Sequence, residues 1–458
     1  MGHYSGWLHA AGIREGDRVA IAMERSAALA ICILGVMAAG ACPCPLEPGL
    51  GADEAQRRTL VAGLTWIVVD GANFAAGGDS GLPPDRCLVF ETEPQSEPYW
   101  APSISGDSDG FLLFTSGSSG KPKGVLQNHR GMLANARGVI RHTDLSFADR
   151  FLHIMPLHHT NGVNNQLIAP LVVGSSVVLA SRFKAEHMPG LMARHRPTIV
   201  TGVPTMYSRM LPLDFPRESV ESLRVLRCGS APITAELHRK IEEKFGHPVV
   251  ISYGLSEATC TSTMNPPQQR RVGSVGTTLD GQTVFLRDAQ GNAISGPGID
   301  GEICISGPTL MTGYLLEGGD GMPQHPGDVL RTGDLGRFDS DGYLFITGRL
   351  KDVIIRGGEN LSPTLIEEAI AAVPGVAACC VVGMPHADLG EVPVAVVVRH
   401  KDMSGTALEA DMIRHAVESR LSRSHQPIQT YFVEALPENS TGKVDRKAVR
   451  QQVAAWVE

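Results

Sequence analysis

The stretch that most constrains this 458-residue chain is FLLFTSGSSGKPKG, residues Phe111 to Gly124. Its first four residues are apolar and predict a short buried strand. The glycines behind them allow positive φ and close approach to a ligand, and successive backbone N–H groups in such a turn form an anion-binding concavity. Hydroxyls and lysines add donors and positive charge. The stretch therefore predicts a phosphate-binding loop, with these phosphate contacts: Thr115, Ser116, Gly117, Ser118, Ser119, Gly120 and Lys123.

The general nucleotide loop GxxxxGK[ST] does not fit, because Gly117 and Gly120 are two residues apart and Pro122 follows Lys121. This spacing disfavours a P-loop kinase. The stretch matches instead the pattern [ST]SG[ST][ST]GxPKG and so resembles the adenylate-forming family, which includes acyl-CoA synthetases, luciferases and adenylation domains of peptide synthetases. The alternative, a solvated Ser/Gly linker, is disfavoured by the apolar strand directly before it.

Composition excludes several classes of partner. The net charge of −8 gives no reason to expect nucleic acid or an anionic membrane. The nine cysteines include no CxxC pair, which favours reduced thiols and a cytoplasmic protein. The apolar run from Ala27 to Ala41 is short for a membrane span, and Ser26 before it predicts a buried, capped helix.

Strands and helices alternate over residues 7–70, which predicts a parallel sheet covered on both faces. Residues 71–108 are rich in Gly, Pro, Ser and Asp and predict a surface connection. The opening segments resemble those of the family but begin almost at Met1, whereas members usually carry a few tens of residues ahead of them. Either the start is short or an N-terminal portion is absent.

The predicted fold class is α/β with two parts. A large N-terminal adenylation domain, 1–348, has parallel α/β sheets and a small β-rich subdomain at about 270–347, where short strand-like runs alternate with turns. Residues 349–352 resemble the family's hinge, with Lys351 as the pivot. A mobile α+β domain, 353–458, completes the chain.

The second strong motif is Tyr253-Gly254-Leu255-Ser256-Glu257, which resembles the family's YGxTE element. Tyr253 offers a flat face for adenine, and the Ser256 hydroxyl can reach the α-phosphate. Glu257 can hold Mg²⁺, which prefers oxygen ligands shared with nucleotide phosphates. An exposed carboxylate at a helix start is the structural alternative for Glu257.

Further motifs resemble the rest of a nucleotide site. Asp334, in the family's TGD element, can accept both ribose hydroxyls, and Arg349 is expected near the ribose. A loop resembling the family's GGAP element is expected against adenine, with these residues: Gly229, Ser230, Ala231 and Pro232.

The acyl pocket is expected beside Leu157-His158-His159, which resembles the family's P-L-aromatic-H-x-x-G element. His159 is then the family histidine at the pocket mouth, and His158 replaces an aromatic residue. A merely structural role, such as capping a helix, is the alternative for either. The predicted pocket residues are His158, Asn161, Asn164, Val203 and Gly254. Buried amides need partners, so the sequence favours a small or polar-substituted acid over a long alkyl chain.

In the C-terminal part, Gly357 and Gly358 match a loop that lines the pantetheine channel in thioester-forming relatives. Lys443 matches the family's catalytic lysine, at the expected spacing from Gly442 and Arg446.

The resemblance implies a two-step reaction that uses ATP, Mg²⁺ and coenzyme A, with Lys443 and His159 as the catalytic pair. A carboxylate attacks the α-phosphate of ATP, releases pyrophosphate and leaves an acyl-adenylate, which then passes its acyl group to coenzyme A. One alternative is transfer to a carrier protein or an amine. Another is a non-catalytic relative that binds nucleotide or acyl-adenylate, against which Lys443, Glu257 and Asp334 argue. A homodimer is a further expectation.

Overall fold

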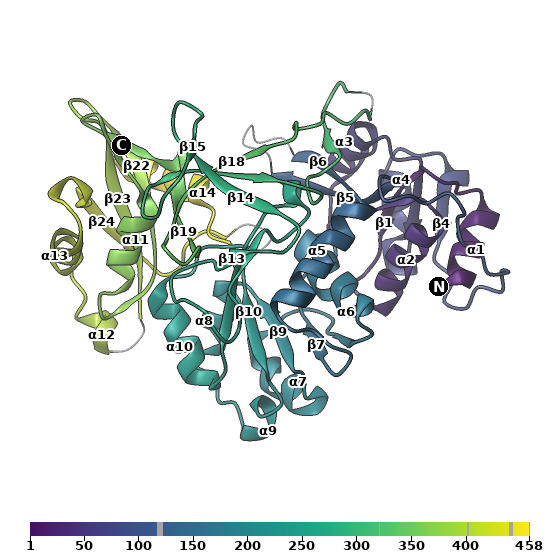
Figure 1. The fold of residues 1–458 in the computed structure, drawn as a ribbon, viewed down its shortest axis with the longest axis horizontal. Helices are drawn as coiled ribbons and strands as arrows, with labels where there is room; N and C mark the ends of the chain where they lie inside the picture. The colour runs from purple at the N-terminus through teal and green to yellow at the C-terminus, as the bar shows by residue number, and fades with distance from the viewer. Residues whose placement is uncertain (117–121, 320, 401–402, 439–442, 458) are drawn as a thin grey trace.

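The structure is a computed structural model that describes residues 1–116, 122–319, 321–400, 403–438 and 443–457. The N-terminal part occupies one end of the molecule in Figure 1 and the C-terminal part the other. The long seven-stranded sheet runs between them. This arrangement confirms the predicted α/β class, with large parallel sheets followed by a smaller C-terminal unit.

The first sheet has four parallel strands in the order β2-β1-β3-β4. Ser26 caps α2 as predicted, because its side chain accepts a hydrogen bond from Leu29 N at 3.3 Å. The elements of this region are β1 (Arg18–Ala22), β2 (Cys42–Pro45), β3 (Trp66–Val69), β4 (Cys87–Val89), α1 (Gly2–Ala11), α2 (Ala27–Ala38), α3 (Ala52–Ala62) and α4 (Phe74–Asp79). The prediction of a mere surface connection over 71–108 is wrong in part, because β4 pairs with β3 at the sheet edge.

A three-stranded sheet follows, in the order β17-β6-β5. Its strands are β5 (Asp109–Ser116), β6 (Pro122–Asn128) and β17 (Gly313–Leu315). Residues 111–114 of β5 are buried as predicted, with Phe111 at 0% and Phe114 at 7% exposure.

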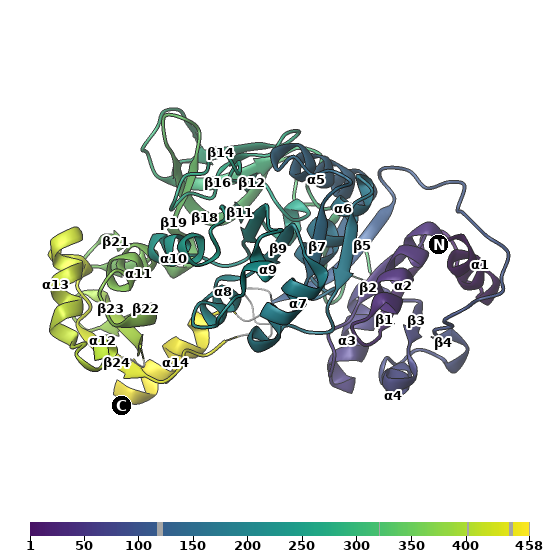
Figure 2. The same ribbon diagram turned by 90° about the horizontal axis from the view of Figure 1, so that it is seen from below.

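The central sheet has seven strands in the order β13-β12-β11-β10-β9-β7-β8, of which the five from β11 to β8 are parallel. Helix α5 lies on one face, and α7, α8 and α10 lie on the other (Figures 1 and 2). The strands are β7 (Arg150–His153), β8 (Ser176–Leu179), β9 (Ile199–Gly202), β10 (Val225–Cys228), β11 (Val249–Tyr253), β12 (Thr263–Met264) and β13 (Thr277–Thr278). The helices are α5 (His129–His142), the π-helix η3 (Asn161–Ile168), α6 (Ala169–Val172), α7 (Met188–His195), α8 (Pro204–Met210), α9 (Arg217–Val220) and α10 (Ala235–Phe245).

The predicted β-rich region forms a five-stranded sheet in the order β15-β14-β16-β18-β19. These strands are β14 (Thr283–Arg287), β15 (Ala293–Ile294), β16 (Gly301–Ser306), β18 (Leu330–Phe338) and β19 (Leu344–Arg349). The short helix η6 (Leu350–Asp352) leads from it into a separate sheet with its own two apolar cores. That unit contains β20 (Ile354–Arg356), β21 (Glu359–Leu361), β22 (Val376–His386), β23 (Gly390–Arg399), β24 (Gln429–Val433), α11 (Pro363–Ala371), α12 (Met403–Thr406), α13 (Ala410–Arg420) and α14 (Arg446–Val457).

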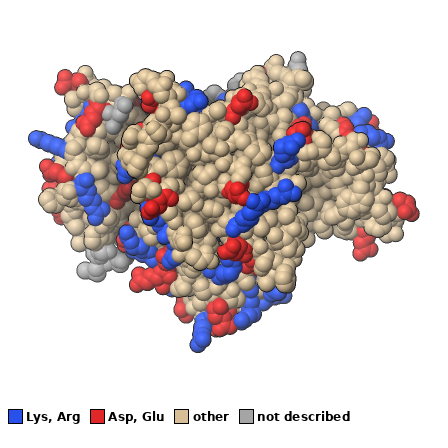
Figure 3. Space-filling view, viewed as in Figure 1, with Lys and Arg blue, Asp and Glu red and all other residues tan. Residues whose placement is uncertain are grey.

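Acidic and basic side chains are interspersed on the face shown in Figure 3, without one large patch of a single sign. All nine cysteines are free thiols. Within the described ranges, the helices are too short or too polar to span a bilayer.

Candidate active site

The hairpin of β5 and β6 brings Lys123 opposite Thr115 and against β17. Lys123 Nζ lies 5.1 Å from the centre of the Tyr314 ring, and the Tyr314 hydroxyl donates to Glu257 Oε1 at 2.9 Å. Burial, and then the Glu257 carboxylate, raise the pKa of Tyr314, so the phenol remains a donor at neutral pH. A predicted phosphate lysine and the predicted magnesium ligand are thus joined through one tyrosine.

The carboxylate of Glu257 is the kind of oxygen ligand that the implied Mg²⁺ prefers. Among the described residues, no group of three or more His, Cys, Asp and Glu side chains could hold a metal ion. Mg²⁺ at nucleotide sites does not need such a cage, because one or two carboxylates, water and substrate phosphates complete its octahedron. Tyr314 bonds to Oε1 of Glu257, and among the described residues no side-chain donor competes with a metal for Oε2.

The predicted adenosine residues converge from three strands. The Tyr253 hydroxyl, at the end of β11, donates to Asp334 Oδ2 at 2.8 Å. Arg349 lies opposite Asp334 in the β18–β19 ladder, and its Nε is 2.5 Å from Asp334 Oδ1. Asp334 is only 4% exposed, so its charge is held between a phenol and a guanidinium. The structure therefore brings together three residues that are spread over almost a hundred positions of sequence.

Two glycines of this region have backbones that touch other backbones or side chains. A Cβ on Gly254 would lie 1.9 Å from the carbonyl oxygen of Cys260, and one on Gly229 would lie 2.7 Å from Ser252 Oγ. Ser230 follows with φ of +65°, a strained value for a non-glycine residue, and its Oγ accepts from Asn161 Nδ2 at 3.3 Å. This loop, which also includes Ala231 and Pro232, is therefore fixed against η3.

His158 and His159 lie just before η3, with ring centres 4.4 Å apart. Burial is the main cause that lowers the pKa of His159 to about 3, and His158, Lys443 and Arg58 lower it further. The pKa of His158 falls to about 4, mainly through burial and then Arg58. Nε2 of His159 is buried and has no hydrogen-bond partner among the described residues. The pair is therefore neutral at pH 7, with one ring nitrogen available.

Lys443 comes from the other end of the chain and lies near the same place. The charge of Lys443 helps to lower the pKa of His159, and the charge of Arg349 helps to lower the pKa of Lys443, so the lysine lies close to both residues. Burial, and then Arg349, lower its pKa. An ion pair joins the two parts of the chain here, with Arg209 Nη2 at 2.8 and 3.0 Å from the carboxylate oxygens of Glu438. Figure 2 shows the segment before α14 passing next to α8, which carries Arg209.

The predicted pocket amides are largely committed to the protein. Asn164 is fully buried, and its Nδ2 donates to Gln127 Oε1 at 3.0 Å and to Thr160 Oγ1 at 2.7 Å. Gln127 in turn donates to the carbonyl oxygens of Ser256 and Thr259 at 2.9 and 2.8 Å. This network holds η3 against the YGLSE segment. Val203 is buried directly before α8, at 1% exposure.

The remaining predicted residues lie apart or outside the description. Gly357 and Gly358 form the β20–β21 turn with φ of +57° and +85°, and a Cβ on Gly357 would meet Leu389 of the same unit. Lys351 is exposed in η6. The predictions for Gly117, Ser118, Ser119 and Gly120, and for the Ser116 side chain, lie outside the described residues.

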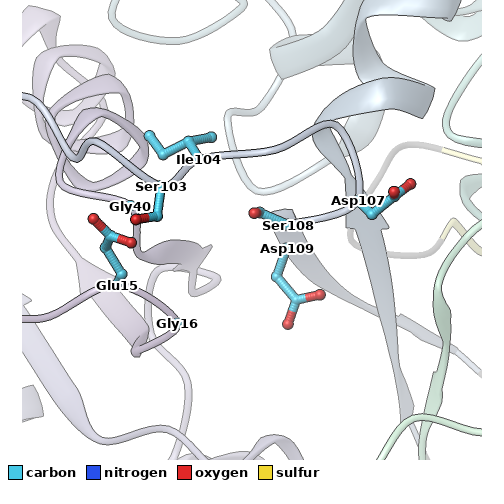
Figure 4. A pocket seen from close by; sticks show the side chains of 8 residues that line it. All are labelled: Glu15, Gly16, Gly40, Ser103, Ile104, Asp107, Ser108 and Asp109. Carbon is cyan, nitrogen blue, oxygen red and sulfur yellow. The ribbon is translucent and has the colours of Figure 1, made fainter.

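A cavity of about 250 Å³ lies elsewhere, between the first sheet and the start of β5 (Figure 4). Its wall includes Glu15, Asp107 and Asp109, and burial raises the pKa of Asp109. The acidic wall is unsuited to a polyphosphate, and none of the predicted site residues lines it.

Several residues of the site escaped the sequence analysis. Gln127 and Arg58 have tertiary roles that no local pattern marks, whereas Tyr314 lies in the pair Gly313-Tyr314, which resembles an element of the family but predicts no role for the hydroxyl. Arg227 did carry a signal, because it is a charged residue inside the apolar run VLRC.

These features are the ones expected of an adenylate-forming enzyme, with the predicted nucleotide residues between the sheets and the predicted lysine of the C-terminal unit close by. The model of the AMP-binding enzyme family matches residues 2–315, and that of the AMP-binding enzyme C-terminal domain matches residues 365–443. The chain belongs to this adenylate-forming family.

Individual relatives agree with this family assignment. The chain is 35% identical to a sulfoacetate–CoA ligase of Cupriavidus necator, over 95% of this chain and 88% of that one. It is 32% identical to a feruloyl-CoA synthase of Amycolatopsis, over 97% and 90%. ATP-bound MatB from Rhodopseudomonas palustris superposes with a TM-score of 0.90 at 29% identity, covering 100% of this chain and 92% of that one. An o-succinylbenzoate CoA synthetase of Bacillus subtilis with ATP and magnesium gives 0.82 at 26% identity, over 98% and 92%.

The particular activity follows from the family and these relatives. The chain is an AMP-forming acid–CoA ligase, and ATP, Mg²⁺ and coenzyme A are the reagents of that reaction.

Proposed function

We propose that this ligase activates a small or polar-substituted carboxylic acid, with Lys443 as the residue that carries adenylation. The observation behind the proposal is the approach of Lys443 to His159 and Arg349, which brings a half-buried ammonium near the predicted ribose and acyl residues. A cation at that position stabilises charge that develops on the α-phosphate and on the attacking carboxylate.

The other residues have binding and orienting roles. The loop from Thr115 to Lys123 cradles the β- and γ-phosphates, and Ser256 donates to the α-phosphate. Asp334, already oriented by Tyr253 and Arg349, accepts the ribose hydroxyls with its remaining lone pairs. Since the protein forms no covalent bond in this step, positioning and charge stabilisation supply most of the rate.

Glu257 would hold Mg²⁺, which would offset the negative charge of the triphosphate. Tyr314 keeps the Glu257 carboxylate in place through its hydroxyl, and Lys123 lies over the Tyr314 ring. Neutral His159 lies at the mouth of the proposed acyl pocket. Its Nε2, which has no hydrogen-bond partner among the described residues, can bond to the substrate carboxylate.

The second step requires the C-terminal unit to rotate about Lys351, so that Lys443 leaves and the turn at Gly357 and Gly358 lines the coenzyme A channel. The boundaries 1–348, 349–352 and 353–458 remain predictions on which this step depends. Coenzyme A, as acceptor, is favoured over a carrier protein or an amine by the relatives, which are named as CoA ligases.

Two finer proposals concern the setting of the enzyme. The nine free thiols favour a reducing compartment such as the cytoplasm. A homodimer stays a proposal, to be checked by light scattering.

The experiment that tests the function is acid-dependent ATP–pyrophosphate exchange over a panel of carboxylic acids, each repeated with coenzyme A. Exchange with thioester formation is expected for small, polar-substituted acids. Exchange without thioester would identify a different acceptor, and absence of exchange with every acid would reject the adenylating function.

A further inference from the structure

One charged residue lies inside the central sheet. Arg227, in the middle strand β10, is 2% exposed. Its neighbours Leu226 and Cys228 pack into the core on the α8 and α10 side. Strand alternation directs Arg227 to the other face, where α5 and η3 cover the sheet and where Val225 is buried.

The guanidinium of Arg227 is under-satisfied. Nη2 donates to Thr143 Oγ1 at 2.6 Å, and the group lies 5.5 Å from the centre of the Phe151 ring. Nε and Nη1 are buried and have no hydrogen-bond partner among the described residues. The nearest carboxylate, Asp149, pairs directly with Arg224 at 3.1 Å and offsets the Arg227 charge only through space. Burial lowers the pKa of Arg227 to about 10, which leaves it protonated at pH 7.

Other orphaned polar groups lie on the same side of the sheet. Thr201 is the ladder partner of Arg227 on β9, and its buried Oγ1 also has no hydrogen-bond partner in the part of the chain that the structure describes. Both polar atoms of the Gln166 side chain are buried and have no partner within the described ranges, and Gln166 belongs to η3, which packs against α5 and β7. Buried polar atoms are normally paired, so several orphans in one region indicate that they meet a ligand.

The position in the fold agrees with ligand binding. Arg227 and Thr201 lie one residue before the carboxyl ends of parallel strands, the edge of an open α/β sheet where ligands bind. The residues that follow are Gly229 and Val203, which belong to the predicted adenine loop and acyl pocket. Cys260, after the YGLSE segment, also lies within electrostatic reach of Arg227. The backbone of Arg227 therefore lies beside the residues assigned to the acid.

We propose that Arg227 binds a second anionic group at the far end of the acid, so that the substrates are small carboxylic acids carrying a sulfonate or a second carboxylate. This rests on the proposed function, since it names the substrate class of that site. The planar fork of arginine offers two parallel N–H groups to either oxyanion. A buried, unpaired charge lowers the stability of the free enzyme, and an anionic substituent would satisfy it on binding.

The test compares matched acids by ATP–pyrophosphate exchange: a dicarboxylic acid with its half-amide, and a sulfo-carboxylic acid with its sulfonamide. The quantity is the ratio of kcat/KM for the charged acid to that for its uncharged partner. Arg227→Met is expected to lower the ratio about 100-fold, the scale for losing one partner of a buried charge pair. In the wild type, the charged acid with the larger ratio shows whether the preferred distal group is a sulfonate or a carboxylate.

Thermal unfolding provides the second readout. Arg227→Met removes an unpaired buried charge, so its Tm is expected to equal or exceed that of the wild type. The charged acid should raise the Tm of the wild type and not of the variant. Arg224→Met is the matched control, because that arginine is paired with Asp149: its Tm should fall while the ratio stays constant.

Three results would overturn the proposal. One is an unchanged ratio in Arg227→Met; another is a wild-type preference for the uncharged acids. The third applies where Arg227→Met fails to fold: a wild-type Tm that the charged acid raises no more than its uncharged partner does would show that the buried arginine meets no anion. Exchange with uncharged acids alone would refute this inference and leave the proposed function standing, whereas no exchange at all would reject both.

Discussion

Replacing Tyr314 with phenylalanine isolates one hydroxyl of the predicted magnesium site. The hydroxyl donates to Glu257 Oε1 at 2.9 Å, while the ring lies against Lys123. Phenylalanine keeps the ring and therefore the contact with the lysine. The substitution thus tests only whether the hydrogen bond positions the carboxylate.

The magnitude follows from the type of bond. A hydrogen bond to a charged group contributes about 1.5–3 kcal/mol, and removal of such outer-sphere partners lowers metal affinity by about 10- to 100-fold. We expect the Mg²⁺ concentration that half-saturates adenylation to rise by this factor in Tyr314→Phe. Because the loss is one of affinity, excess Mg²⁺ should restore most of the rate.

The assay is isothermal titration calorimetry of ATP binding at a series of Mg²⁺ concentrations, alongside ATP–pyrophosphate exchange. Tyr343→Phe is the control, since that phenol donates to the carbonyl oxygen of Gln269, away from Glu257. Equal Mg²⁺ dependence in the two variants and the wild type would refute the positioning role of Tyr314.

Three further predictions concern the lysine side of the site. Lys443→Ala should reduce pyrophosphate exchange by about 10²- to 10³-fold, the scale for losing one preorganised electrostatic group, while thioester formation from supplied acyl-adenylate is kept; intact exchange would contradict the assignment. Because burial lowers the pKa of His159 to about 3, the exchange rate should show no inflection near pH 6.5 from this residue, and an inflection removed by His159→Asn would count against a neutral histidine. Arg209→Ala breaks the ion pair with Glu438, whose two side chains are 55% and 30% exposed, so we expect the exchange rate to fall by no more than about fivefold. The double variant Arg209→Ala, Glu438→Ala should lose no more rate than the single variant, and additive losses would show that the pair is not coupled.

The elements that sequence predicts well are those decided locally. The strand over 111–114 and the cap at Ser26 follow from apolar runs and one hydroxyl, and both are present. The strand Cys87–Val89 was missed because three residues at a sheet edge become a strand only through β3. Propensity cannot register a partner that lies twenty positions earlier.

The candidate site also contains residues that local motifs predict and contacts that only the tertiary structure reveals. Tyr253, Asp334 and Arg349 were recognised from their separate motifs, but their mutual bonds depend on how two different sheets meet. The hydroxyl of Tyr314 became informative only once its partner Glu257, 57 positions away, was visible. Arg227 was visible as a charge within an apolar strand, yet its unsatisfied nitrogens required the packing of α5 above it.

The contacts around Lys443 differ sharply in strength, and the difference bears on how the lysine can leave. Arg446, three residues further on, lies 2.7 Å from Glu367 and 3.8 Å from Asp352 of η6, and these carboxylates help raise its pKa. The lysine loop is thus tied by a half-buried cation to the segment predicted as the hinge.

Across to the N-terminal part, by contrast, the ion pair between Arg209 and Glu438 is solvent-exposed and therefore weak. A rotation that breaks the exposed contact and preserves the half-buried ones moves Lys443, Arg446 and η6 as one body. This favours withdrawal of the lysine by rotation of the whole C-terminal unit over local unfolding of its loop.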